Sequence, residues 1–79
     1  MTLSAKDIVE KDILAYIKAR RTNTELPNPV DAWVTRGFAE KVVYRKLEKL
    51  EARRLIDCGV SIRQCWLTPE GEKYLASLA

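Results

Sequence analysis

A single glycine, Gly37, separates two stretches of helical periodicity and constrains the fold of this chain more than any other residue. Upstream, Asn28 is a good N-cap and Pro29 suits the first position of a helix, so we expect a short helix that covers residues 30–36. A glycine directly after a helix supplies the left-handed conformation that a sharp turn needs. The sequence therefore predicts a tight corner at Gly37, with Phe38 packed between the two helices.

The helix after this corner, predicted over residues 40–54, has two contrasting faces. Val43, Leu47 and Leu50 lie within about 60° of one another at ~100° per residue and predict a buried stripe. Four cations recur every four residues and form one slanting row: Lys41, Arg45, Lys49 and Arg53. Like charges at this spacing repel by a few tenths of a kcal/mol per pair. The row therefore favours an anionic partner, and a DNA duplex is the obvious one.

The net charge of +3 is concentrated on this one helix. Residues 40–54 hold six basic and three acidic side chains, whereas the rest of the chain holds eight of each. Such a concentration is typical of a nucleic-acid-binding surface. The alternative is an ordinary solvated face of mixed lysine and glutamate.

The segments before Gly37 predict a first helix and a break. Ser4 and Asp7 form a plausible capping box, and apolar residues keep helical spacing from there, so we expect a helix over residues 5–20. The polar stretch 21–28 contains a proline and ends this helix. It is expected to contribute a short strand over residues 24–26.

The segments after the cationic helix predict a hairpin and a last helix. Residues 55–58 and 64–67 alternate as two strands around a turn at 59–63. Thr68 followed by Pro69 then predicts a helix over residues 69–78. On the strands, the side chains expected to face inward are Ile56, Cys58, Cys65 and Leu67, and Trp66 is expected to face outward. The helices are expected to bury Val9, Ile13, Ile17, Val30, Trp33, Val34, Tyr74, Leu75 and Leu78.

Two cysteines and no histidine exclude a usual four-ligand zinc site within one chain. We expect Cys58 and Cys65 to be reduced thiols that serve as small core residues. If the hairpin centres on Ser61 and Ile62, however, the two cysteines lie opposite each other, and an oxidised pair is the alternative. No metal and no cofactor are expected.

The 79 residues are expected to form one domain over 1–79. A chain of this size buries roughly 60–65% of its unfolded surface and is marginal alone, so a homodimer is expected. The charged N-terminus lacks the apolar core of a signal peptide, and no apolar run approaches the ~18 residues of a membrane span, so we expect a cytoplasmic protein. An enzyme is not expected, because there is no histidine, no glycine-rich phosphate loop and no nucleophile beside a base.

The segment GFAEKVVYRKLEKLEARRLID, at residues 37–57, followed by WLTPEG, at residues 66–71, resembles winged helix-turn-helix regulators of the MarR-like and PadR-like type. The resemblance implies an α+β fold with a three-helix core, a two-stranded β wing and a short C-terminal helix. It also implies a small transcriptional regulator that binds double-stranded DNA with the 40–54 helix in the major groove.

Carried over by position, the resemblance assigns a DNA-binding set. The residues at the bases would be Ala39, Glu40, Lys41, Val42, Tyr44 and Arg45, with Lys49 nearer the phosphates and Arg63 as the wing contact. Arg45 and Lys41 suit guanine O6 and N7. Ala39 stands where a Ser or Thr usually caps the helix, and Glu40 adds negative charge there. No small-molecule effector is evident.

Two alternatives to duplex DNA stay open. The same scaffold can serve as a protein-protein interaction module that presents Trp66 or the 40–54 helix to an acidic protein. RNA binding is the third possibility, and it would favour single strands or loops over duplex.

Overall fold

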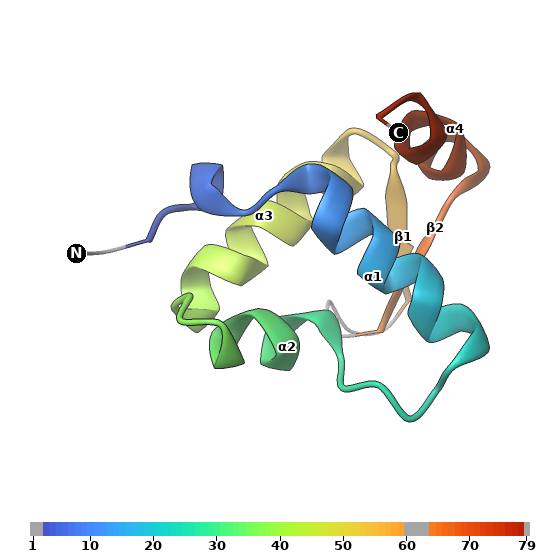
Figure 1. Ribbon diagram of the computed structural model, residues 1–79. Helices are drawn as coiled ribbons and strands as arrows, with labels where there is room; N and C mark the ends of the chain where they lie inside the picture. The colour runs from blue at the N-terminus through green and yellow to red at the C-terminus, as the bar shows by residue number, and fades with distance from the viewer. Residues whose placement is uncertain (1–2, 60–63, 79) are drawn as a thin grey trace.

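The computed structural model describes residues 3–59 and 64–78 (Figure 1). These residues form a 3-10 helix, η1, four α-helices and a two-stranded antiparallel sheet, which confirms the predicted α+β class. The order along the chain is η1 (Ala5–Asp7), α1 (Glu10–Thr22), α2 (Pro29–Thr35), α3 (Glu40–Ala52), β1 (Ile56–Cys58), β2 (Cys65–Leu67) and α4 (Pro69–Ser77). This order is compatible with a winged-helix layout.

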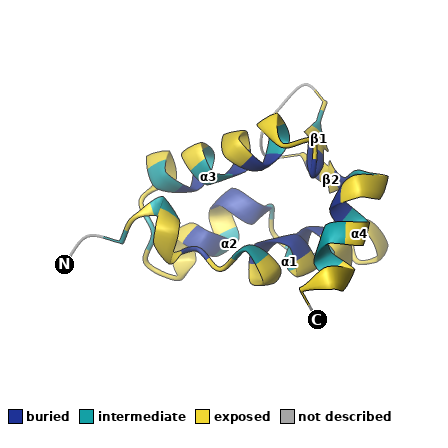
Figure 2. Cartoon of the chain, turned by 90° about the horizontal axis from the view of Figure 1, so that it is seen from above, coloured by how far each residue is buried: buried dark blue, intermediate teal, exposed yellow. Residues whose placement is uncertain are grey.

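One cluster of buried side chains lies between the helices and the hairpin. Seen from above, α3 lies along one edge of the molecule and turns its buried residues toward α1 and α2 (Figure 2). The hairpin closes the end of this cluster and is followed by α4, which packs on α1. The buried cluster consists of Ile8, Ile13, Leu14, Ile17, Val30, Trp33, Val43, Leu47, Leu50, Leu55, Ile56, Cys65 and Leu67.

The first helix differs from its prediction because the chain breaks at Ile8. The Asp7 carboxylate accepts a hydrogen bond from the Ser4 N–H at 2.8 Å, as the predicted capping box requires, but it closes only the single turn of η1. Ile8 is extended and buried, so the chain dips into the core before α1 begins at Glu10. Val9, predicted on the apolar face, becomes the N-cap of α1 and is 55% exposed.

The strand predicted over residues 24–26 is wrong, since that segment forms a turn against α1. Side chains of α1 donate hydrogen bonds to its carbonyl groups. The Tyr16 hydroxyl donates to the Pro27 carbonyl at 2.7 Å, and Arg20 Nε donates to the Leu26 carbonyl at 3.3 Å. These bonds satisfy the backbone without a partner strand.

The corner at Gly37 forms as the sequence predicts. Asn28 Oδ1 accepts the Asp31 N–H at 3.0 Å at the start of α2, and Gly37 at its end has φ 107°. The Gly37 N–H donates to the Val34 carbonyl, and the Phe38 N–H donates to the Trp33 carbonyl. This pair of hydrogen bonds is the pattern of a Schellman cap. Trp33 is buried as expected. Val34 is not: it is 41% exposed, because it lies on the outer side of this short helix.

Helix α3 ends at Ala52, two residues before its predicted end. Arg54 takes the left-handed conformation with φ 61°, which stops the helix. The Arg54 N–H donates to the Glu51 carbonyl at 2.8 Å, and the Leu55 N–H donates to the Leu50 carbonyl at 3.1 Å. This is the same cap as at Gly37, with an arginine in the position that favours glycine.

Replacing Arg54 by glycine is therefore expected to stabilise the fold by about 0.5–1 kcal/mol. A side chain in the left-handed region costs roughly 1–2 kcal/mol, and the extra unfolded-state entropy of glycine offsets part of that gain. The free energy of unfolding in urea measures the effect. Arg54→Ala is the control, because it removes the same charge but keeps a Cβ. Equal stabilities of Arg54→Gly and Arg54→Ala would argue against a conformational cost at this position.

In the hairpin, Ile56 lies opposite Leu67 and Cys58 lies opposite Cys65, which is the register given above as the alternative. The expectation of two reduced thiols is wrong, because this register joins Cys58 and Cys65 in a disulfide across the two strands. Trp66 faces outward and is 47% exposed, as predicted. The turn at residues 60–63 lies outside the described residues.

The last helix, α4, begins at the predicted cap. Thr68 Oγ1 accepts the Gly71 N–H at 3.0 Å and donates to the Arg54 carbonyl at 2.6 Å, so it links α4 to the end of α3. Leu78, predicted to be buried, is 36% exposed because α4 ends at Ser77. In the described part of the chain, none of the helices has the length and apolar character needed to cross a membrane.

Candidate nucleic-acid interface

Three cations form an exposed row along the outer face of α3. Lys41, Arg45 and Lys49 are spaced by four residues, and all three are exposed. At 1.5 Å per residue the row extends over about 12 Å of the helix. Among the described residues, none of these three side chains takes part in an ion pair or hydrogen bond. We call these three residues the cationic row.

Lys46 of α3 and Arg53, the residue after it, are both paired with a carboxylate of α1. Glu10 Oε2 lies 2.9 Å from Lys46 Nζ and 2.8 Å from an Arg53 guanidinium nitrogen. The Arg53 guanidinium carbon also lies 5.0 Å from the centroid of the Tyr74 ring. Arg53, predicted as the fourth member of the row, is therefore paired with α1 and packed on α4, and it does not belong to the row.

Glu10 is the centre of this internal network. The Tyr74 hydroxyl donates to Glu10 Oε1 at 2.6 Å, so one carboxylate on α1 joins α3 and α4. The pKa of Glu10 falls from 4.5 to about 2, chiefly through the hydrogen bonds from Tyr74 and then Lys46, against an opposing effect of burial. The carboxylate stays ionised wherever the protein is folded near neutral pH.

This low pKa predicts an acid-sensitive tie between α1, α3 and α4. Because the folded-state pKa of Glu10 lies below its unfolded value, its contribution to stability is complete above pH 4.5 and is lost as the pH falls toward 2. We expect roughly 2–3 kcal/mol to disappear over this window.

A comparison of Glu10→Gln with the parent protein measures the contribution of the ionised Glu10 carboxylate to stability. The variant should be less stable at pH 7 by about 2 kcal/mol and should approach the parent at pH 2.5. Urea unfolding at several pH values measures both. Glu25→Gln, at an exposed glutamate, is the matched control and should follow the parent. Parallel pH curves for the parent and Glu10→Gln would contradict the role of the network.

The other predicted base-facing residues divide between exposed and half-buried positions. Ala39 and Glu40 are exposed at the start of α3, and Ala39 provides no side-chain cap. Val42 and Tyr44 are half-buried and pack against the core, so they lie beside the cationic row and not on it. Arg63 lies outside the described residues.

Two further exposed arginines lie near α3: sequence reasoning missed Arg36 and counted Arg54 only as one of the charges of the 40–54 helix. Arg36 ends α2, and its guanidinium carbon lies 4.1 Å from the centroid of the Trp33 ring. Arg54 follows the end of α3. The predicted ends of the two helices could have identified both arginines, since each one lies within one residue of a Schellman turn.

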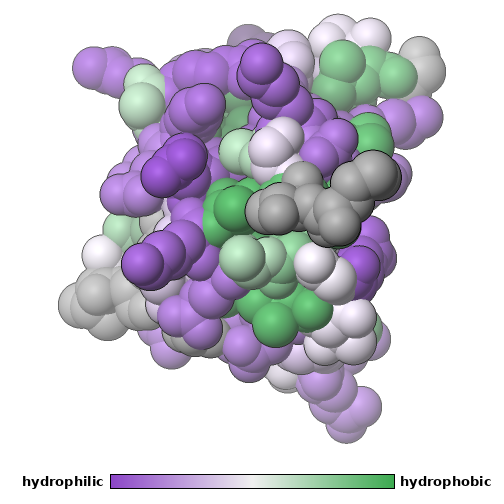
Figure 3. Space-filling model, turned by 90° about the vertical axis from the view of Figure 1, so that its left-hand side faces the viewer, coloured by the Kyte–Doolittle hydropathy of each residue, from purple (hydrophilic) through white to green (hydrophobic). Residues whose placement is uncertain are grey.

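The start of α3 lies at the same end of the molecule as η1 and the α2–α3 corner (Figure 1). Viewed from that end, hydrophilic side chains cover most of the surface, and apolar side chains gather near its centre (Figure 3). The N-terminal end of α3 therefore lies beside both charged and apolar surface.

No family model, curated protein or solved structure matches this chain. Its function must therefore be argued from its own residues. Within residues 3–59 and 64–78, no three His, Cys, Asp or Glu side chains gather in a way that could hold a metal ion.

Proposed function

We propose that this chain is a winged helix-turn-helix domain that binds double-stranded DNA as a small transcriptional regulator. The observation that supports the proposal best is the cationic row on the outer face of α3. In this assignment α2, the Gly37 corner and α3 form the helix-turn-helix, and the β1–β2 hairpin is the wing. Helix α3 lies in the major groove.

The positions along α3 suggest a division of roles. Lys41 and Arg45 are in its N-terminal half, where side chains can reach guanine O6 and N7. Lys49 is one turn farther on and suits a phosphate. Ala39 offers no acceptor to the N–H groups of the first turn, so these groups can donate to a phosphate oxygen.

A homodimer follows from the affinity that one copy can supply. A single module of this size buries roughly 600–1,000 Å² on DNA, at the lower end for specific complexes. Two copies on half-sites about 34–36 Å apart would double the contacts and read a pseudo-palindrome. We therefore propose binding as a dimer.

The salt dependence of duplex binding tests the proposal. Each bound copy brings three cations close to the phosphates, whichever atoms they contact, which predicts a log-log slope of roughly −3 per copy, or about a 60-fold loss of affinity per copy between 50 and 200 mM salt. A selection of random duplexes supplies the oligonucleotide, and fluorescence anisotropy measures the slope. The mass in solution gives the stoichiometry. A flat salt response, or tighter binding of single-stranded RNA than of the duplex, would contradict the proposal.

The exposed Trp66 supports a second candidate, a protein-interaction module. A tryptophan that is 47% exposed on the outer face of a hairpin is a frequent anchor in protein interfaces. This candidate is favoured if the selection enriches no duplex at low salt.

A further inference from the structure

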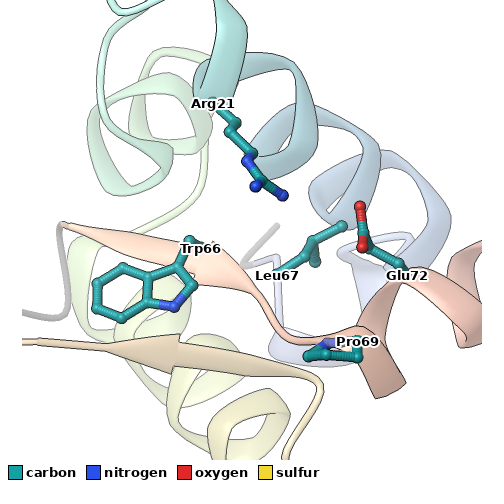
Figure 4. A pocket seen from close by; sticks show the side chains of 5 residues that line it. All are labelled: Arg21, Trp66, Leu67, Pro69 and Glu72. Atoms are coloured by element: carbon teal, nitrogen blue, oxygen red, sulfur yellow. The ribbon is translucent and has the colours of Figure 1, made fainter.

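A hollow of about 490 Å³ lies on a different part of the molecule from the cationic row. It is bounded by the C-terminal end of α1, by β2 and by the first turn of α4 (Figure 4). The described residues that line it are Arg21, Trp66, Leu67, Pro69 and Glu72. Its volume is in the range of small-molecule sites.

The base of the hollow is apolar and held in place. Leu67 is buried beneath it, and Pro69 is fixed as the first residue of α4. The Trp66 ring lies near Gly59, the residue after β1, where an added Cβ would lie 3.4 Å from the ring.

Two opposite charges face this apolar base. The guanidinium of Arg21 and the carboxylate of Glu72 both point toward the space above Leu67 (Figure 4). They do not pair with each other, and neither forms an ion pair or hydrogen bond with any other described residue. The hollow thus presents one donor group and one acceptor group to the same volume, and the Trp66 ring lies at its edge, turned away from both charges (Figure 4).

We propose that this hollow binds a free α-amino acid with a large apolar or aromatic side chain. Its carboxylate would accept two hydrogen bonds from Arg21, its ammonium would donate to Glu72, and its side chain would cover Trp66. A ligand with one charge leaves the other protein charge unmatched, and the interior of a peptide has neither charge. This proposal does not depend on DNA binding by α3.

The affinity should be weak because the hollow is open to solvent on one side. A ligand of about a dozen heavy atoms that is only partly enclosed corresponds to a Kd on the order of 1 mM. Such a Kd is within the reach of NMR titration.

The two tryptophan indole N–H signals provide the readout. Phenylalanine should shift the Trp66 signal and leave the signal of the buried Trp33 unchanged. Phenylalanine amide lacks the carboxylate and N-acetylphenylalanine lacks the ammonium, so each should bind about tenfold more weakly. An unshifted Trp66 signal at about 20-fold the expected Kd, or equal affinities for the three ligands, would overturn the proposal.

Two variants assign the contacts separately. Arg21→Gln should bind phenylalanine and its amide equally while still disfavouring the N-acetyl compound. Glu72→Gln should do the reverse. Lys73→Gln, at an exposed lysine on α4, is the control and should keep the parent pattern. An Arg21→Gln protein that still prefers phenylalanine to the amide would show that Arg21 does not hold the carboxylate. An unchanged Trp33 signal confirms that each variant is folded.

Discussion

Replacing Lys41 and Arg45 together by alanine is expected to weaken duplex binding about 100-fold. Each contact to a base edge or phosphate contributes roughly 1–3 kcal/mol, so the loss of two costs roughly 2–6 kcal/mol, and a factor of about 100 lies toward the lower end of that range. Each lost cation also reduces the salt slope by about one, so the slope should fall from roughly −3 to roughly −1. Both side chains are exposed and outside the internal pairs, so the fold should not change.

A matched control removes the same charge elsewhere. Lys18 on α1 and Lys73 on α4 are exposed and lie on helices other than α3. The Lys18→Ala, Lys73→Ala protein should keep the salt slope and lose only a few-fold in affinity, because distant exposed charges are screened. If the Lys41→Ala, Arg45→Ala protein bound the selected duplex like the parent, α3 would not be the reading helix. Equal losses in both double variants would indicate attraction by net charge alone.

Local signals allowed the corner, the α3 core stripe and the two strands of the hairpin to be predicted, whereas the hairpin register was only a conditional alternative. Gly37 ends a helix for a reason that lies within three residues, and the burial of Val43 and Leu50 follows from helical periodicity. The pairing of Cys58 with Cys65 follows from the period of a strand once the turn is placed. The disulfide was only an alternative, because its formation depends on redox conditions that the sequence does not state.

The elements that sequence reasoning missed depend on tertiary contacts. Ile8 leaves helical geometry because a buried position is available to it against α3. The turn before α2 replaces a predicted strand because Tyr16 and Arg20 bind its carbonyls from α1. Neither contact is encoded by local propensity.

In the candidate site, too, local sequence predicted some features and tertiary contacts determined the others. Helical spacing was enough to place Lys41, Arg45 and Lys49 on one exposed face. It could not reveal that Arg53 is bound by Glu10, which is 43 residues away in the sequence. Simple counting of charges on α3 therefore overstated the charge available to a partner.

Gly71→Ala is expected to destabilise the protein by about 3 kcal/mol, more than the other single substitutions considered. A Cβ at this position would overlap the backbone carbonyl of Leu55, which cannot rotate away. Helix α4 would have to move off the start of the hairpin, at a typical overpacking cost of 1–3 kcal/mol. The same movement would weaken the Thr68 cap, worth about 1 kcal/mol, and the bond from the Thr68 N–H to the Leu55 carbonyl.

Thermal and urea unfolding measure this effect, with two other glycines as internal comparisons. For a domain of this size, 3 kcal/mol corresponds to a fall in Tm of about 12–20 °C. Gly59→Ala meets only ordinary contact with the Trp66 ring and should change stability by less than about 1 kcal/mol. Gly37→Ala has space but a φ of 107°, so it should cost about 1–2 kcal/mol. If Gly71→Ala were as stable as Gly59→Ala, the close approach of α4 to Leu55 would not exist in solution, and the seating of Thr68 on the end of α3 would have to be revised with it.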